Sequence, residues 1–216
     1  DYRSMTDAGR HPGRVALNLS LKQLRQASFM LHCRSVFEKH GVSPQNLELE
    51  ITETGLMKEV HDVIKSLHRL NEIGVEISID DFGTGYSSLA YLTTLPISVL
   101  KIDRSFVRDL GMTPQSSAVV TAIIALARSL GLRVIAEGVE TMRQMEVLHR
   151  LGCTLMQGYL FTRPQAPGDI ERWLQEVVMT RNAPWFSISN EAAASGEGSA
   201  TNLLLASGTG RGPGPR

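Results

Sequence analysis

The chain contains near its centre the segment Val75-Glu76-Ile77-Ser78-Ile79-Asp80-Asp81-Phe82-Gly83, an alternating aliphatic run that ends in two carboxylates and a glycine. Alternation with period two predicts a β-strand, Val75–Asp80, with Asp80 on the face opposite to the aliphatic side chains. The glycine indicates a tight turn over whatever the aspartates bind. We therefore expect helices on the aliphatic face and the carboxylates on the other face of a sheet.

Five further aliphatic runs alternate with amphipathic stretches, which is the pattern of βα units around a parallel sheet. Ser20 and Thr141 stand where helix N-caps belong, and a glycine follows each stretch, where a left-handed residue ends a helix. The predicted strands are Val15–Leu19, Leu47–Thr52, Val75–Asp80, Val99–Ile102, Leu132–Ala136 and Leu155–Gly158. The predicted helical stretches are Leu21–His40, Val60–Ile73, Ser116–Leu130 and Met142–Leu151, followed by Gly41, Gly74, Gly131 and Gly152.

The length of 216 residues and the hydrophobic content of 42% are typical of one soluble domain. We assign residues 1–180 to that domain and residues 181–216, which are rich in Gly, Ser, Ala and Pro, to a disordered tail. Six βα units predict an α/β fold, either an open doubly wound sheet or most of a (β/α)8 barrel. Both architectures place ligands at the carboxyl ends of the strands.

Charge and cysteine content exclude several classes of protein. The 22 Lys and Arg residues balance the 22 Asp and Glu residues, so no overall field attracts nucleic acid or an anionic membrane. The longest nearly apolar stretch, Val119–Ala127, is about half of a membrane span. Cys33 and Cys153 lie far apart without CxxC spacing, which favours reduced thiols and a cytoplasmic location.

Polar side chains stand at or directly after the ends of all six predicted strands. One carboxylate at such a place is more often a helix cap, but six strand ends in a row are not explained by capping. Because parallel strands end at the same edge of a sheet, we expect these side chains to converge on one site. They are Asn18, Glu50, Asp80 with Asp81, Lys101, Glu137 and Gln157.

Converging carboxylates raise one another's pKa unless a cation lies among them, so the pattern predicts a metal site. The donors are oxygens and the six histidines fall outside the strand ends, which favours Mg²⁺ or Mn²⁺ over Zn²⁺. The adjacent pair Asp80-Asp81 can serve two ions, as in two-metal phosphodiester hydrolysis. Lys101 would then hold a phosphate or the attacking water.

The same residues carry a resemblance to a known family. In order and spacing they resemble the EAL-domain family of cyclic di-GMP phosphodiesterases, from about Val15 to Leu174. The motifs are Leu17-Asn18-Leu19-Ser20, Glu48-Leu49-Glu50-Ile51-Thr52-Glu53, Asp80-Asp81-Phe82-Gly83-Thr84-Gly85, Lys101-Ile102-Asp103, Ala136-Glu137-Gly138-Val139-Glu140 and Gln157-Gly158-Tyr159.

The resemblance implies a modified TIM barrel that hydrolyses one phosphodiester bond of cyclic di-GMP with Mg²⁺ or Mn²⁺, giving linear pGpG. It implies that Lys101 and Gln157 act on the attacking water and that Glu53 braces the loop after Asp80-Asp81. The implied ligands are Asn18, Glu50 and Asp80 for a first ion, and Asp80, Asp81 and Glu137 for a second ion and the water.

The Glu-Ala-Leu segment that names the family, whose Glu is a metal ligand, is absent from this sequence. Its nearest match, Glu146-Val147-Leu148, falls inside a predicted helix. We therefore expect an incomplete (β/α)8 barrel of about six βα units that lacks the first two strands.

Three alternatives compete with hydrolysis. The chain could be a receptor that binds cyclic di-GMP without cleaving it, or a truncated fragment without activity. It could also be a different Mg²⁺-dependent barrel enzyme that stabilises an enolate with strand-end carboxylates and a Lys base. The resemblance further implies a homodimer, and sensor or GGDEF domains on the N-terminal side. Any membrane anchor is expected in that N-terminal region.

Overall fold

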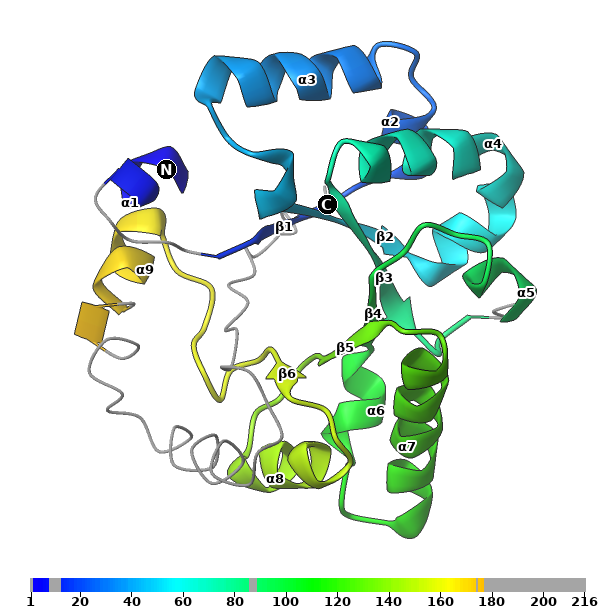
Figure 1. The fold of residues 1–216 in the computed structure, drawn as a ribbon. Coiled ribbons are helices and arrows are strands. Elements are labelled where there is room, and N and C mark those ends of the chain that lie inside the picture. Colours follow the sequence, from blue (N-terminus) through cyan, green and yellow to red (C-terminus); the bar gives the residue numbers. More distant parts are fainter. Residues whose placement is uncertain (1, 8–12, 86–88, 174, 177–216) are drawn as a thin grey trace, which may run out of the picture.

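Six parallel strands form one curled sheet in the order β1-β2-β3-β4-β5-β6. The structure is a computed structural model that describes residues 2–7, 13–85, 89–173 and 175–176. The curl leaves β1 and β6 apart, so the sheet is an open half-barrel and the expected barrel class is confirmed (Figure 1). The strands are β1 (Val15–Asn18), β2 (Leu47–Thr52), β3 (Glu76–Phe82), β4 (Val99–Ile102), β5 (Arg133–Ala136) and β6 (Leu155–Met156).

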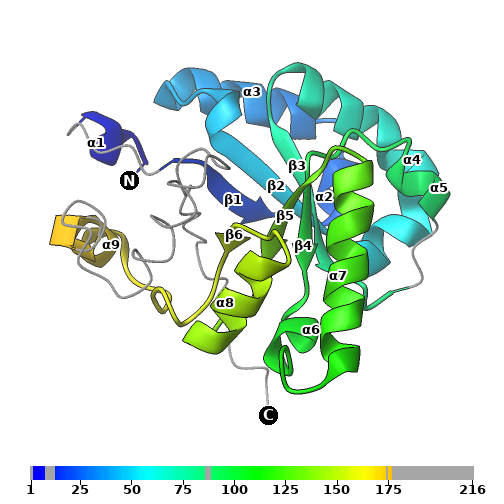
Figure 2. The same cartoon turned by 60° about the horizontal axis from the view of Figure 1, so that its bottom comes forward.

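The long helices cover the outer, convex face of the sheet, and the short helices α1 and α9 lie on its open side (Figures 1 and 2). A short 3₁₀ turn, Pro44–Asn46, leads into β2. The helices are α1 (Tyr2–Asp7), α2 (Leu21–Leu24), α3 (Phe29–His40), α4 (Glu53–Glu72), α5 (Leu89–Leu92), α6 (Arg104–Arg108), α7 (Pro114–Ser129), α8 (Met142–Arg150) and α9 (Pro167–Trp173).

The hydrophobic core lies between the outer face of the sheet and these helices. α4 packs against β3, and Leu67 and Leu70 of the helix are fully buried with Ile77 and Ile79 of the strand. Period two therefore places the aliphatic residues of β3 outward and its polar residues inward, as the sequence predicted. This division frees the inner face for chemistry.

The two predicted N-caps and the four predicted helix-ending glycines are confirmed. Ser20 and Thr141 each form a capping box with the glutamine three residues on, Gln23 and Gln144. Gly41, Gly74, Gly131 and Gly152 all have φ between +61° and +97°. These turns return the chain to the amino end of the next strand.

The single helix predicted over Leu21–His40 was wrong. Residues 25–28 form turns between α2 and α3, and all four are exposed, so no apolar contact holds a continuous helix there. α4 begins at Glu53, seven residues before the predicted Val60, because Glu53 and Leu56 are buried at its first turn. β6 ends at Met156 rather than Gly158, and β3 continues past Asp80 to Phe82.

The disordered tail predicted for residues 181–216 lies outside the described residues and stays a prediction. Among the described residues, no helix combines the length and the hydropathy that a membrane crossing requires.

Replacing Leu67 by Ala should lower the free energy of unfolding by about 2–5 kcal/mol, because the side chain is 0% exposed and leaves a cavity between α4 and β3. Urea denaturation followed by circular dichroism measures the loss. Leu31→Ala on α3 is the control, since Leu31 is 70% exposed, and should cost at most about 0.5 kcal/mol. Equal losses in the two variants would contradict this description of the core.

Candidate active site

The inner face of the half-barrel is polar at the carboxyl ends of its strands. Parallel pairing places Asn18 of β1 opposite Glu50 of β2, and Thr52 of β2 opposite Asp80 of β3. Glu137 follows β5 directly, and its amide donates to the carbonyl of Ile102 at the end of β4. The sheet therefore brings polar groups from five consecutive segments to one edge.

Lys101 lies at the centre of this edge. Its side chain is 3% exposed, and its Nζ lies 2.5 Å from a carboxylate oxygen of Glu50 and 2.5 Å from one of Glu137. Asp80 lies at 3.6 Å, which is an ion pair but too long for a hydrogen bond. We call these four residues the Lys101 cluster. The cation that converging carboxylates require is thus supplied in part by the chain itself, which the sequence analysis did not foresee.

The cluster changes the acid–base properties of its members. Burial alone would lower the pKa of the Lys101 ammonium, but Glu137, Glu50 and Asp80 together raise it. Burial raises the pKa of Glu137 to about 7, although Lys101 opposes the rise. Lys101 is therefore a permanent cation at neutral pH. The carboxyl group of Glu137, in contrast, gains or loses its proton near pH 7.

Two consecutive aspartates face the same point, which a regular strand forbids because alternate side chains point to opposite faces. The pairing of β3 with β4 shifts register between Ile79 and Phe82, and Asp81 has φ +55°. Both the backbone amide and the hydroxyl of Thr84 donate to the Asp81 carbonyl and hold this conformation. A bulge of this kind re-aims a side chain at the end of a strand.

The bulge creates an acidic cluster with the geometry of a metal site. Asp80, Asp81 and Glu137 each offer an oxygen, and these oxygens all lie within 4.8 Å of one another. The Oδ1 atom of Asp80 is buried and has no hydrogen-bond partner among the described residues. An orphaned buried carboxylate oxygen in a set of oxygen donors fits a hard divalent cation such as Mg²⁺ or Mn²⁺.

Two further predicted site residues, Asn18 and Gln157, have their backbones at the same edge of the sheet. Asn18 is exposed at the end of β1, beside Glu50 in register. The backbone of Gln157 connects two strand ends, since its amide donates to Ala136 and its carbonyl accepts from Val139. The backbones of both residues therefore lie at the edge where the carboxylates meet, and their predicted chemical roles remain proposals.

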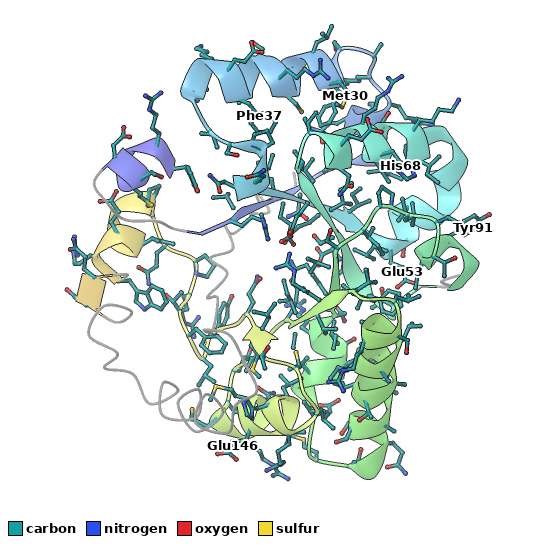
Figure 3. The ribbon with its side chains drawn as sticks, in the orientation of Figure 1. Met30, Phe37, Glu53, His68, Tyr91 and Glu146 are labelled. Carbon is teal, nitrogen blue, oxygen red and sulfur yellow. The ribbon has the colours of Figure 1, made fainter. Side chains whose placement is uncertain are left out.

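Glu53 is fully buried at the start of α4 and contacts the loop after the two aspartates. Its Oε2 accepts hydrogen bonds from the amides of Gly83 at 2.7 Å and Gly85 at 3.2 Å. Figure 3 shows it among the side chains between the strand ends and the helices. Gly83 has φ +97°, which a residue with a side chain rarely adopts. The geometry is that of a brace for this loop.

The segment Glu146-Val147-Leu148 lies on α8, as its sequence context indicated. Glu146 is exposed and points away from the barrel in Figure 3. Among the described histidines, His68 lies on α4, on the outer side of the sheet (Figure 3). Neither residue belongs to the Lys101 cluster or to the acidic cluster of Asp80, Asp81 and Glu137.

Two residues of the site were not assigned a role from the sequence. Asp103 caps α6 by accepting from the Ser105 amide at 2.9 Å and contacts the carboxyl group of Asp81. Burial, the charge of Asp80 and this contact all raise the pKa of Asp81. Glu48 lies one inward position before Glu50 and is fully buried. Period two placed it on the inner face, but only the structure shows that it is sealed there.

Parallel strands with outer helices and strand-end carboxylates define a domain of the (β/α)8-barrel class, whose active sites lie at this edge. A family model described as "EAL domain" matches residues 1–164. The chain belongs to the EAL domain family.

Individual relatives agree with this assignment. The chain is 46% identical over 175 residues to a protein of Pseudomonas aeruginosa named cyclic di-GMP phosphodiesterase NbdA, covering 81% of this chain but only 22% of that protein. The solved PaMucR phosphodiesterase in complex with c-di-GMP has 44% identity and a TM-score of 0.74, over 78% of this chain and 68% of that one. The BlrP1 complex of Klebsiella pneumoniae with manganese and cyclic di-GMP has 31% identity and a TM-score of 0.68, over 75% and 42%.

Replacing Glu53 by Ala should loosen the loop at Gly83 and Gly85, because both amides lose their buried acceptor. An unsatisfied buried group costs about 1–3 kcal/mol, so amide hydrogen exchange at these two positions should accelerate by about tenfold or more. Exchange measured by NMR or mass spectrometry tests this. Glu146→Ala is the matched control on an exposed helix position and should leave both rates unchanged; unchanged rates in Glu53→Ala would contradict the bracing role.

Proposed function

We propose that this domain hydrolyses cyclic di-GMP to linear pGpG in a metal-dependent reaction. The carrying observation is the convergence of Asp80, Asp81 and Glu137 within 4.8 Å beside the buried Lys101, in a chain of the EAL domain family. The named activities of NbdA and PaMucR support the substrate. One phosphodiester bond is opened by water, so the ring becomes a linear dinucleotide with a 5′-phosphate.

The residues of the edge divide the work. Asn18, Glu50 and Asp80 would hold one ion, and Asp80, Asp81 and Glu137 a second. We call Glu50, Asp80, Asp81 and Glu137 the strand-end carboxylates. Mg²⁺ or Mn²⁺ bound there would supply positive charge to the phosphate oxygens and lower the pKa of the attacking water.

The chain's own groups then orient the reactants. Lys101, held as a cation by Glu50 and Glu137, faces the place where negative charge builds up on the phosphate or the attacking water. Burial raises the pKa of Glu137 to about 7 in the metal-free protein, so Glu137 would release a proton when it takes up an ion beside that water. Gln157 extends the hydrogen bonds to the water, and Glu53 keeps the loop after Asp81 in place.

The proposal also covers the domains that accompany this one. The chain spans 22% and 24% of the length of the curated relatives NbdA and MucR, and MucR is named a bifunctional diguanylate cyclase and phosphodiesterase. We infer that further sensor or GGDEF domains accompany this domain, that it forms a homodimer, and that it acts in the cytoplasm.

Replacing Asp80 by Asn should reduce hydrolysis by at least about a hundredfold, because Asp80 belongs to both proposed ion sites and an amide cannot supply its charge. The unsubstituted protein, called the parent below, and the variant are purified and incubated with cyclic di-GMP and Mn²⁺. The linear dinucleotide is quantified by chromatography. Glu146→Gln, on the exposed face of α8, is the control and should retain the parent rate.

Parental turnover in Asp80→Asn would contradict the proposal. Binding of cyclic di-GMP by the parent without any turnover would favour the receptor function instead. Turnover of a carboxylate substrate alone would favour an enolate-stabilising enzyme.

Mn²⁺ binding should weaken as the pH falls below 7, because metal must displace the proton from Glu137, whose pKa is raised by burial to about 7. Well below that pH, one displaced proton weakens the apparent affinity by about tenfold per pH unit. Titrations followed by electron paramagnetic resonance between pH 5.5 and 8.5 measure this. Glu137→Gln should bind Mn²⁺ more weakly and lose this slope; an affinity of the parent that is constant over the range would contradict the assignment.

A further inference from the structure

The inner face of the sheet carries one buried carboxylate outside the Lys101 cluster. Glu48 of β2 lies two residues, or roughly 7 Å along the strand, before Glu50, and it is 0% exposed. Neither of its carboxylate oxygens has a hydrogen-bond partner among the described residues. The hydroxyl oxygen of Ser78 on β3 is also buried and also has no hydrogen-bond partner among the described residues.

Such a group destabilises the fold. A buried carboxylate without hydrogen bonds loses its hydration and gains little in return, and an apolar side chain of similar size is often the more stable choice. A costly group of this kind, next to a site with other perturbed groups, marks a functional residue rather than a packing residue.

Two cations, Lys101 and Arg133, act electrostatically on Glu48. Burial raises the pKa of Glu48, and among the charges Glu50 raises it further while Lys101 and Arg133 lower it. Arg133 already has a carboxylate of its own, because it pairs with Glu76 of β3. Glu76 also receives Arg14 at 2.6 Å. Lys101 differs from Arg133 because its own partners, Glu50, Asp80 and Glu137, are the proposed metal ligands.

The need for such a carboxylate follows from the charges of the edge. In the proposed function, two divalent ions neutralise the four strand-end carboxylates. Lys101 would then be a buried cation next to other cations, with no carboxylate left to balance it. Among the described residues of the six strands, Glu48 is the buried carboxylate outside the proposed ligand set that acts electrostatically on Lys101.

We propose that Glu48 is a positioning residue that balances the charge of Lys101 and keeps its ammonium in place when the strand-end carboxylates bind metal. The inference rests on the proposed function. It assigns Glu48 no contact with the substrate, so its effect is carried through Lys101.

The test compares Glu48→Gln and Glu48→Leu with the parent in three measurements: Mn²⁺ binding without substrate, urea denaturation, and steady-state hydrolysis. Loss of one charge several ångströms from a partly buried site should weaken Mn²⁺ binding by about tenfold or more in both variants. kcat should fall by a similar factor, with KM within about twofold. Glu48→Leu should keep or raise the urea midpoint, so that function is lost while stability is not.

Glu76→Gln is the matched control, because Glu76 is also an acidic residue of the inner face but pairs with Arg14 and Arg133. It should lower the urea midpoint and leave Mn²⁺ binding within about twofold of the parent.

Parental Mn²⁺ binding and turnover in both Glu48 variants would overturn the inference and leave the proposed function intact. An equal loss of Mn²⁺ binding in Glu76→Gln would also overturn it, since the effect would then belong to the barrel as a whole. A parent that neither binds Mn²⁺ nor hydrolyses cyclic di-GMP would overturn both proposals.

Discussion

The arrangement of the site depends on one buried cation. Lys101 of β4 is paired with Glu50 of β2 and Glu137 after β5, at 2.5 Å each, in surroundings that leave its side chain 3% exposed. Burying a charge in a protein costs on the order of several kcal/mol unless its partners are close and well placed. The curvature of the sheet must therefore bring these strand ends together, and a change at any one of them leaves the others unbalanced.

The second constraint is the irregular end of β3. The register shift turns both Asp80 and Asp81 toward Glu137, and the positive φ of Asp81 costs about 1 kcal/mol that other contacts must offset. The hydrogen bonds from Thr84 and those between Glu53 and the loop glycines offset it. Through these hydrogen bonds, Glu53 connects the first turn of α4 to the loop beside the acidic cluster.

The sequence predicted those features that short-range patterns determine. Period two assigned the inner and outer residues of β2 and β3, and caps such as Ser20 and glycines such as Gly41 located the helix ends. The convergence of Glu50, Asp80, Lys101 and Glu137 also followed, because parallel strands end at one edge.

The features that were missed depend on packing between distant segments. The break between α2 and α3 follows from which faces are buried, and the re-aiming of Asp81 follows from a register shift between two strands. The pairing of Lys101 with Glu50 joins residues 51 positions apart. No local pattern distinguishes a lysine that binds a phosphate from one that also neutralises the carboxylates beside it.

These two roles of Lys101 are physically linked. The ammonium holds Glu50 and Glu137 side by side, so the proposed ion sites would need little rearrangement to take up metal. The same ion pairs compete with the metal, because each carboxylate shared with Lys101 is a weaker ligand. Metal affinity is then a balance between preorganisation and competition, and a further negative charge that balances Lys101 while metal holds the strand-end carboxylates shifts this balance toward metal. Glu48, buried on the inner face beyond Glu50, is such a charge.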